Sequence, residues 1–596
     1  MTAPTGAPAG PGTDRAPEER ALLVRVLSTL LREDVVGLRT RSTVLDRPDG
    51  PWLRLPARTG EALLLPLAPD GYQAEYAARL PLLVRESNGT RLTGTGEVLA
   101  ALRALADPLD RDGFDAFAAE CREALAALRL HTATHDELTT ALADRYGPDP
   151  AHWTGPAAGL AHDALAARLD HPVYPASRGR AGLDEAGLRA YAPEFHPRFP
   201  LRRLLLPRTA VTVAGDADGH APLVDDSDAP EQSATHFALP VHPLTVGAPL
   251  DAALRETGLA GEAVLSPRPG PLAVPTLSMR TVALAADPLL HLKLPLATAT
   301  LGLRNRRTIK PGTLVDGAAG QRLLETVLAR EPRFRESVLQ ADETVYAHAG
   351  HELLAVLCRR YPAGLAGSTV VPLAALLAPA PGGRLVIDHF ADRFYGGDPL
   401  ALLDAFLTLL FDWQTTLFGY GIGLESHQQN VSLVLDGTGP RGTRLRLLFK
   451  DNDGPRINTV RLRERLGRDA PGPADFADRR ICGDSDGPVC EVFTTITVHL
   501  CAGSYAFGLA RHGRAPLDRL LALVRDRLAE AVERLGTGPG EPGAVLRARL
   551  LDAPRLPVKA MVSAGTLLTK ERSGAADINK HYTTGPNYLL PTAGVR

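Results

Sequence analysis

Apolar residues in the first quarter of the chain recur at the three- and four-residue spacing of an amphipathic helix. The first stripe follows Pro17, a residue that suits the first turn of a helix, and it comprises Leu22, Leu23, Val26, Leu27, Leu30 and Leu31. The same spacing predicts helices over residues 95–107 and 114–130, whereas residues 62–85 alternate more as strands do. We therefore predict a mostly helical domain over residues 17–155, which ends at the segment PDPAHWTGP.

Short apolar runs dominate the middle of the chain. Clusters of Asp, Gly and Pro separate these runs, which occupy residues 211–215, 237–246, 275–285 and 291–301. This pattern predicts a mainly antiparallel sheet in a second domain, residues 156–384, which ends at the segment PAPGGR. The acidic segment 216–232 is predicted to be a solvated, mobile loop.

Helical spacing returns in the last part of the chain. It covers residues 320–331, 400–417, 515–535 and 543–552. We assign residues 385–596 to a third domain, and residues 1–16, which are mainly Ala, Pro, Gly and Thr, to a disordered tail. Helical and antiparallel segments that follow one another in this way predict an α+β fold.

A β-hairpin is predicted within the third domain. The runs VSLVLD (431–436) and RLRLLF (444–449) flank a glycine-rich turn. A turn centred near residue 440 places Asn430 beside Asp451, with His427 and Glu425 just behind. Carboxylate and amide oxygens are ligands that Mg²⁺ prefers, so we predict a magnesium site formed by Asn430, Asp451 and Glu425. The alternative is an ordinary polar turn.

Composition narrows the function classes. The chain has 66 Lys and Arg against 68 Asp and Glu, a formal charge of −2, so it lacks the basic excess of a nucleic-acid-binding protein. Five scattered cysteines support neither a disulfide framework nor a zinc site. The first residues do not form a secretory signal, and apolar runs do not reach membrane-spanning length. We expect a cytoplasmic protein with no nucleic-acid or membrane partner.

Basic residues gather in the predicted middle sheet. A turn at Asp287-Pro288 folds one strand against the next, and strand alternation puts Ser278 and Arg280 on one face. Lys293 and Arg304 lie on the following strand and at its end. This set suits phosphates or a polycarboxylate; the alternative is a solvated strand face, the class to which we assign Arg306 and Arg307.

A proline-rich loop, residues 169–182, offers further polar groups. It carries His171, Ser177, Arg178 and Arg180, which a loop backbone can bring to one ligand. The alternative is a stiff connector. Nucleotide motifs such as GxxxxGK[ST], the HExxH metal motif and a kinase-type set of loops are absent from the sequence.

Taken in order, these segments resemble the IucA/IucC family of siderophore synthetases that act without a nonribosomal peptide assembly line. The family's GHPxHPxxKxRxG pattern resembles the segment that starts at Asp170, its APEF stretch resembles residues 191–195, and its HP pair resembles His242-Pro243. The SxRT motif resembles Ser278, Arg280 and Thr281, and the K…T…R pattern resembles Lys293, Thr300 and Arg304. The EaHxQN motif resembles Glu425, His427, Gln429 and Asn430. The RD..G motif resembles Lys450, Asp451 and Gly454, and the KA motif resembles Lys559-Ala560.

The resemblance implies a cupped-hand fold with thumb, fingers and palm regions, which correspond to our three domains. It implies an ATP-dependent ligase that adenylates citrate or a related polycarboxylic or dicarboxylic acid, releases pyrophosphate, and passes the acyl group to an amine or hydroxyl with loss of AMP. It also implies a homodimer. The middle sheet and the hairpin are then expected to line one common cavity around a nucleotide.

The resemblance assigns roles to individual residues. It places ATP and Mg²⁺ on Ser278, Arg280, Thr281, Lys293, His427, Gln429, Asn430 and Asp451. It places the acid on His171, Ser177, Arg178, Thr300 and Arg304. The residues expected to act in catalysis are His427, Arg304, Arg280, Lys293 and His171, with His427 alternatively a base for the incoming amine.

The sequence departs from the family pattern at six positions. Asp170 replaces a glycine, Tyr174 the second His, and Arg178 a Lys; Leu244-Thr245 replace Trp-Gln, and Lys450 replaces an Arg. Because Lys and Arg are not equivalent in binding carboxylates, the change at 178 leaves room for a less usual acid. Two other functions remain open: a ligase that forms an acyl phosphate and ADP, and an inactive binder of nucleotide or iron chelate.

Overall fold

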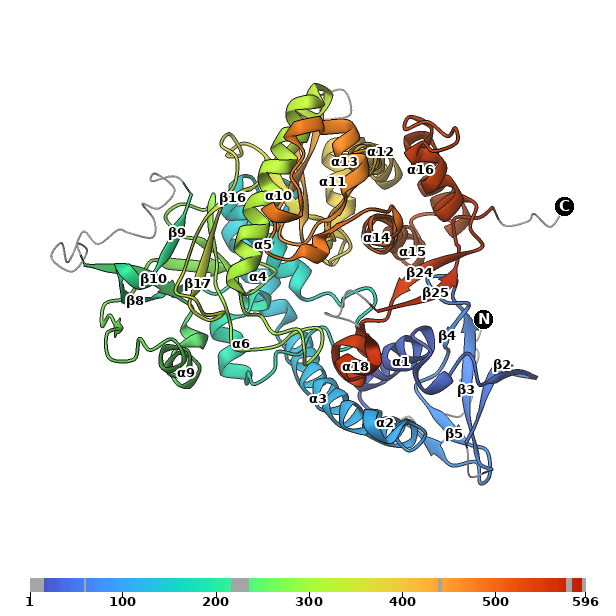
Figure 1. Ribbon diagram of the computed structural model, residues 1–596. Helices are drawn as coiled ribbons and strands as arrows, with labels where there is room; N and C mark the ends of the chain where they lie inside the picture. The colour runs from blue at the N-terminus through green and yellow to red at the C-terminus, as the bar shows by residue number, and fades with distance from the viewer. Residues whose placement is uncertain (1–14, 58–59, 216–234, 438–441, 575–580, 592–596) are drawn as a thin grey trace.

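The computed structural model describes residues 15–57, 60–215, 235–437, 442–574 and 581–591. Within them, helices and mostly antiparallel sheets form three regions, coloured blue to cyan, green to yellow-green, and yellow to red in Figure 1. The predicted disordered tail, apart from Arg15 and Ala16, and the predicted acidic loop 216–232 lie outside the described residues.

The N-terminal region combines helices with a sheet. The predicted first helix is confirmed as α1 (Pro17–Arg32), and its leucine and valine stripe is buried. The other helices are α2 (Thr95–Arg103), α3 (Arg111–Ala133) and α4 (His135–Tyr146). The region also holds a six-stranded sheet, so it contains more strand than we predicted. Its strands are β1 (Thr43–Arg47), β2 (Gly50–Pro56), β3 (Ala62–Pro69), β4 (Tyr76–Ala78), β5 (Leu83–Arg85) and β6 (Arg91–Leu92).

An antiparallel sheet forms the middle region, as predicted. Seven strands lie in the order β7 (Phe199–Pro200), β12 (Leu272–Pro275), β13 (Thr281–Leu284), β14 (Leu290–Lys293), β17 (Ala355–Arg360), β16 (Asp342–His348) and β9 (Thr212–Ala214). A smaller sheet contains β8 (Arg202–Pro207), β10 (His236–Val241) and β11 (Val264–Leu265). The helices are α5 (Gly155–Ala167), α6 (Glu185–Tyr191) and α9 (Ala248–Glu256).

Two predicted strands of this region are interrupted. The run 275–285 contains a turn, residues 276–280, between β12 and β13, so Ser278 and Arg280 lie in the turn and the strand-alternation argument for them is wrong. The run 291–301 ends its strand at Lys293, shortly before Pro295, whose ring nitrogen has no hydrogen to donate to a sheet.

The predicted hairpin is confirmed. Strand β20 (Val431–Asp436) pairs antiparallel with β21 (Arg444–Phe449), Val431 opposite Phe449, in a sheet with β15 (Val338–Gln340) and β18 (Thr369–Pro372). The predicted register was wrong by one residue, because Asn430 lies opposite Lys450, whose N–H donates to the Asn430 carbonyl at 3.1 Å. The turn at 438–441 is outside the described residues.

Helices make up much of the rest of the fold. They are α10 (Pro311–Arg330), α11 (Val386–Tyr395), α12 (Pro399–Gly419), α13 (Thr459–Leu466), α14 (Gly487–Val492), α15 (Ser504–Arg511), α16 (Leu517–Glu533), α17 (Pro542–Leu546) and α18 (Lys570–Ser573). A π-helical stretch, Phe493–Gly503, joins α14 to α15, and shorter π-turns cover 547–551 and 563–567. Further strands are β19 (Ile422–Gly423), β22 (Arg456–Asn458), β23 (Cys482–Gly483), β24 (Arg555–Lys559) and β25 (Tyr582–Pro586).

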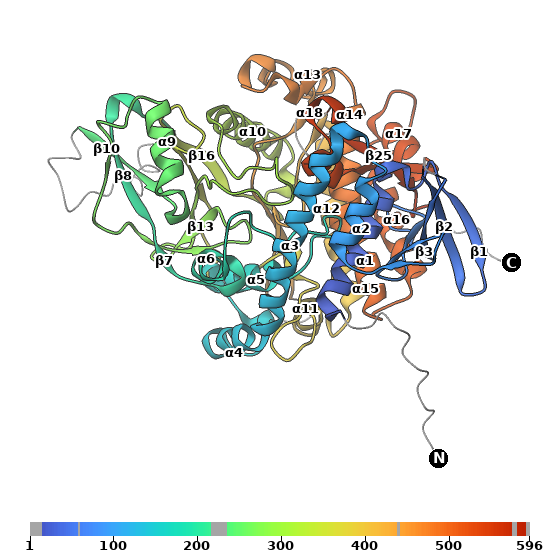
Figure 2. The ribbon, with the colours of Figure 1, turned by 90° about the horizontal axis from the view of Figure 1, so that it is seen from below.

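One apolar core joins the two ends of the chain. It includes Leu27 of α1, Phe411 of α12, Leu528 of α16 and Leu589 near the C-terminus, while the middle sheet packs a core of its own. Figures 1 and 2 both show the blue N-terminal elements beside the red C-terminal ones. The N-terminal and C-terminal regions therefore form one body, against which the middle region packs.

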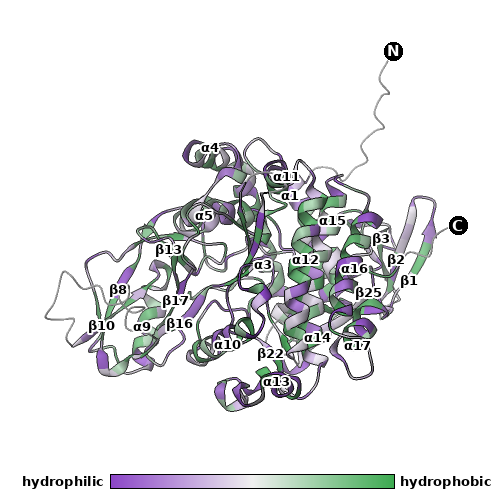
Figure 3. Cartoon of the chain, turned by 90° about the horizontal axis from the view of Figure 1, so that it is seen from above, coloured by the Kyte–Doolittle hydropathy of each residue, from purple (hydrophilic) through white to green (hydrophobic). Residues whose placement is uncertain are grey.

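Two helical stretches, Pro399–Gly419 and Gly487–Arg511, are long and apolar enough to cross a membrane by composition. The fold buries 61% and 100% of their apolar windows, however, which is the position of core helices. Figure 3 shows α12 largely in the hydrophobic colour among elements of mixed polarity.

Candidate active site

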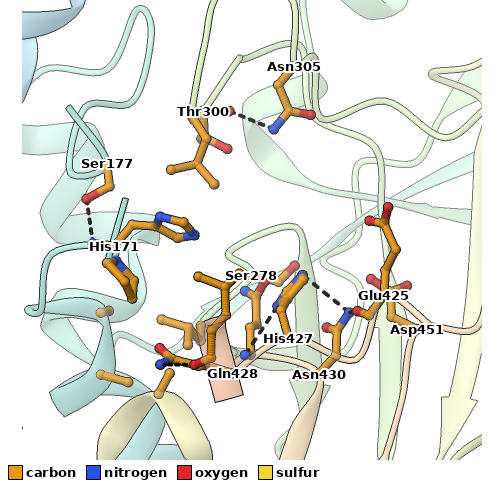
Figure 4. A pocket seen from close by; sticks show the side chains of 18 of the residues that line it. His171, Ser177, Ser278, Thr300, Asn305, Glu425, His427, Gln428, Asn430 and Asp451 are labelled. Atoms are coloured by element: carbon orange, nitrogen blue, oxygen red, sulfur yellow. Dashed lines mark hydrogen bonds between the residues drawn. The ribbon is translucent and has the colours of Figure 1, made fainter. Parts of the chain in front are cut away.

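A cavity of about 370 Å³ opens where the three regions meet. Arg280 and Asp451 both line it, so the basic turn of the middle sheet and the polar end of the hairpin share one space, as expected. Figure 4 shows side chains from loop 169–182, from the turn near Thr300 and from the segment 425–430 directed at the same region. The predicted residues in its wall are His171, Ser177, Ser278, Arg280, Thr300, Glu425, His427, Gln429, Asn430 and Asp451.

The turn between β12 and β13 presents Arg280. Met279 has a φ of +63°, a conformation that non-glycine residues seldom adopt. The turn is held by the Thr281 N–H, which donates to the Ser278 hydroxyl oxygen at 3.3 Å. Arg280 Nη1 donates to the Thr308 carbonyl at 2.8 Å, but its buried Nε has no hydrogen-bond partner among the described groups.

Asp451 is the most strongly engaged acid of the site. It has a φ of +68°, and its carboxylate forms ion pairs with Lys293 and, at 3.1 Å, with Arg359. Burial acts to raise the pKa of Asp451, but Lys293, then Arg359 and Arg280, hold that pKa well below its usual value. Asp451 is therefore ionised at neutral pH.

Two residues that the sequence did not single out hold the backbone at Asp451 and Asn452. Glu343 of β16 accepts the N–H groups of Asp451 and Asn452 at 2.8 and 3.1 Å. The same carboxylate pairs with Arg359 of β17, and both side chains are buried. A strained backbone conformation persists only where the surrounding contacts hold it in place. The hydrogen bonds to Glu343 hold the positive φ of Asp451 in this way.

The two histidines of the cavity wall are neutral. Burial, then the neighbouring His427, lowers the pKa of His171 to about 3, and burial lowers the pKa of His427 to about 4 against the opposing effect of Asp451. His171 Nδ1 accepts the N–H groups of Val173 and Tyr174 at 3.2 and 3.1 Å. Its proton therefore lies on Nε2, which makes His171 a donor.

Four predicted site residues are not in the cavity wall. Lys293 acts through its bonds to Asp451 and, at 3.0 Å, Asp453, and Thr281 holds the Ser278 turn. Arg178 donates to Asp170 at 2.7 Å, and Arg304 Nη1 donates to the Ala564 carbonyl at 3.2 Å. The cations that do line the cavity beside Arg280 are Arg180, Arg307 and Lys559.

Arg307 corrects the sequence interpretation. We assigned Arg306 and Arg307 to the solvated class; Arg306 is exposed, but Arg307 lines the cavity, and burial, then Arg280, lowers its pKa. Its buried Nε, like that of Arg280, has no hydrogen-bond partner among the described groups. Adjacent arginines in a loop look alike in sequence, so no local pattern could have separated them.

Comparison with known proteins agrees with the motif order. Residues 163–378 match the family model described as IucA / IucC family, and residues 401–572 match one described as ferric iron reductase FhuF-like transporter. The middle region of the chain is therefore similar to the IucA/IucC family. It is 26% identical to staphyloferrin A synthase of Staphylococcus aureus over 323 residues, 50% of this chain and 53% of that protein. The match therefore spans about half the length of that relative.

A longer match is to the rhizobactin siderophore biosynthesis protein RhbC of Rhizobium meliloti, 24% identical over 487 residues, 71% of this chain and 74% of that protein. Among solved structures, the petrobactin biosynthesis protein AsbB of Bacillus anthracis has a TM-score of 0.74 at 16% identity and covers 96% of this chain and 95% of its own. ATP-bound aerobactin synthetase IucA of Klebsiella pneumoniae has a TM-score of 0.67 at 18% identity over 96% and 100%. The predicted α+β fold of these synthetases is confirmed.

Several residues that depart from the IucA/IucC pattern form hydrogen bonds or ion pairs within the fold. Asp170 lies between Arg178 and Arg25 of α1, so the two changes in this loop compensate each other in charge. Tyr174 is fully buried, and its hydroxyl donates to Glu120 at 2.6 Å. Thr245 donates to the Pro295 carbonyl at 2.7 Å. Lys450 is buried, with its ammonium 3.4 Å from the Tyr361 hydroxyl.

The donor set of the cavity fits the ligands of this family. Two arginines with unpartnered Nε groups suit phosphate oxygens. Asp451 and Asp453 both contact the Lys293 ammonium, so two carboxylates converge on one point. Among the described residues, no group of three or more His, Cys, Asp or Glu could hold a metal ion alone. Mg²⁺ shares its ligands among one or two carboxylates, water and substrate phosphates, so Asp451 and Asp453 suit it.

Proposed function

We propose that this protein is an ATP-dependent siderophore synthetase. It adenylates one carboxylate of citrate or a related polycarboxylic or dicarboxylic acid, and then joins that carboxylate to an amine or a hydroxyl. The observation that carries the proposal is the shared cavity of Arg280 and Asp451, in which cations suited to phosphate lie with carboxylates suited to Mg²⁺. The names of staphyloferrin A synthase and aerobactin synthetase point to the same product class.

In the first step, a carboxylate oxygen of the acid attacks the α-phosphorus of ATP, and pyrophosphate leaves. Both reactants are anionic, so Arg280 and Arg307 offset their repulsion and stabilise charge that builds on the phosphate oxygens. Asp451, Asp453 and the amide oxygen of Asn430 would hold Mg²⁺, which when bound neutralises phosphate charge. Lys293 keeps the two aspartates together.

The second step occurs at the carbonyl carbon of the activated carboxylate. The nitrogen or oxygen nucleophile attacks the acyl carbonyl and passes its proton to the neutral His427, and AMP leaves with the electrons of the broken C–O bond. His171 donates Nε2–H to an oxygen of the acid, and Thr300 and Arg180 also line the cavity. Fixing both reactants in a closed site is itself a large part of such catalysis.

The test is acid-dependent product analysis. Purified protein is incubated with ATP, Mg²⁺ and hydroxylamine together with citrate, α-ketoglutarate or another acid, and the nucleotide product is identified. A hydroxamate with equal AMP and pyrophosphate is expected. ADP and phosphate would instead select the acyl-phosphate ligase, and tight nucleotide or iron-chelate binding without turnover would select the inactive binder.

We also propose that the enzyme acts as a homodimer in the cytoplasm. Light scattering on the eluting protein measures its mass: 63.4 kDa for one chain or twice that value for the dimer.

A further inference from the structure

Glu120 of α3 connects three segments of the cavity wall. Its carboxylate accepts hydrogen bonds from the Tyr174 hydroxyl at 2.6 Å, from the Leu303 N–H at 2.9 Å and from the Thr566 hydroxyl. These partners belong to three loops far apart in sequence. The loops also carry His171, Thr300 and Met561, all of which line the cavity.

The contacts around Glu120 leave little space for the loops to shift. A Cβ on Gly302, whose φ is +118°, would lie 2.9 Å from Gly565 Cα. A Cβ on Gly113 of α3 would lie 2.1 Å from the Leu567 carbonyl oxygen. Close backbone contacts thus join the segment 563–567 to the turn after Thr300 and to α3. A substitution that removes the Glu120 carboxylate is therefore expected to shift these segments directly.

Removing the Glu120 carboxylate leaves the Tyr174 and Thr566 hydroxyls without this acceptor, whereas the Leu303 N–H keeps a bond to Thr566 Oγ1 at 3.1 Å. The Tyr174 ring is fully buried, and a buried hydroxyl without a partner is costly. The phosphate side of the cavity has separate supports: Arg280 bonds to Thr308, and Asp451 to Lys293 and Arg359. An effect of Glu120 is therefore expected at the His171 and Thr300 end only.

We propose that Glu120 is a positioning residue that sets the distance between the three loops which contact the acid. This inference rests on the proposed function for the statement that the acid occupies the His171 end. The spacing of the loops then depends on one carboxylate of the N-terminal region, which itself does not touch the substrate.

The kinetic test compares Glu120→Ala with Glu120→Gln. A carboxamide keeps an acceptor oxygen for Leu303 and Thr566, and its NH₂ can donate to the Tyr174 oxygen, so Glu120→Gln is the rescue variant. For Glu120→Ala we expect the KM for citrate, or for the acid that the wild type adenylates, to rise about tenfold or more. The Kd of ATP, measured by calorimetry, should stay within about twofold of wild type, because the substitution leaves the bonds that hold Arg280 and Asp451 unchanged. Asp112→Ala, an exposed carboxylate on the same helix, is the control.

Hydrogen–deuterium exchange of the substrate-free protein gives a readout that does not depend on turnover. Glu120→Ala should speed exchange together in peptides that contain residues 171–177, 300–305 and 561–567, and Asp112→Ala should not. Faster exchange in one segment alone, or a lower Tm with an unchanged KM, would overturn the proposal. If the wild type adenylates none of the acids, the proposed function fails, and the exchange pattern alone decides the role of Glu120. Thr566→Val, which removes one donor, is the milder variant should Glu120→Ala not fold.

Discussion

Lys293 and Asp451, which lie 158 residues apart in sequence, form a part-buried ion pair that joins the middle sheet to the hairpin. Each charge has one further partner, Asp453 for Lys293 and Arg359 for Asp451, and removing one partner of a buried ion pair costs about 3–5 kcal/mol. The pair therefore fixes the two halves of the cavity at a defined separation. The pair also keeps the Lys293 ammonium near the part of the cavity where phosphate charge would develop in the proposed reaction.

Replacement of Lys293 tests that role. Lys293→Met keeps the length of the side chain and removes its charge, so Asp451 and Asp453 lose their shared partner. We expect the rate of acid-dependent AMP formation to fall by about 100-fold or more, together with a lower Tm. Lys310→Met, at an exposed lysine, should leave both quantities unchanged. A near-normal rate for Lys293→Met would remove this residue from the site.

The neighbouring arginines 306 and 307 form a matched pair for mutagenesis. Arg307 lines the cavity. Arg306 is exposed, and its ion pair with Glu352, at 3.5 Å, is a surface pair that contributes little to stability. Arg307→Ala should lower kcat/KM for ATP by about 100-fold, in the range that removal of one charge-stabilising donor produces. Arg306→Ala should stay within about twofold of wild type. Equal effects of the two substitutions would contradict the placement of Arg307.

The carboxylate pair predicts a magnesium phenotype. Asp453→Asn removes one of the two carboxylates that meet at Lys293. We expect the Mg²⁺ concentration for half-maximal activity to rise about tenfold, with activity recovering at high Mg²⁺, because a lost ligand lowers affinity by about that factor or more. Asp484→Asn, at an exposed position, is the control, and a loss of activity that Mg²⁺ does not restore would argue against a metal role for Asp453.

The sequence predicted what local patterns determine. Alternating residues around a glycine-rich turn specify the β20–β21 hairpin, and the stripe after Pro17 specifies α1. The register error at Asn430 arose because the turn length, not the strands, sets which residues face each other. Ser278 and Arg280 were assigned to a strand because the apolar residues on both sides hide the turn, which depends on a positive φ at Met279.

Residues that act from a distance were missed for a different reason. Glu343 and Arg359 lie on adjacent core strands, and nothing in either strand's sequence indicates that they support Asp451. Asp453 had a visible signal, the repeated acid in the DND segment, which could have added it to the metal site. Glu120 had none, because its three partners come together only in the folded chain.

The last prediction concerns acid stability and His171. Its pKa is about 3 in the folded protein, lowered first by burial and then by His427, against about 6.5 in an unfolded chain. Between these values the unfolded chain binds a proton that the folded protein does not, so acidification favours unfolding. From pH 7 to pH 5.5 this one site should cost about 1 kcal/mol of unfolding free energy. His171→Gln should therefore lose less stability than wild type over that interval in urea unfolding, and His512→Gln, at an exposed histidine, should follow the wild type. If His171→Gln loses as much stability as wild type, His171 is not buried as a neutral group.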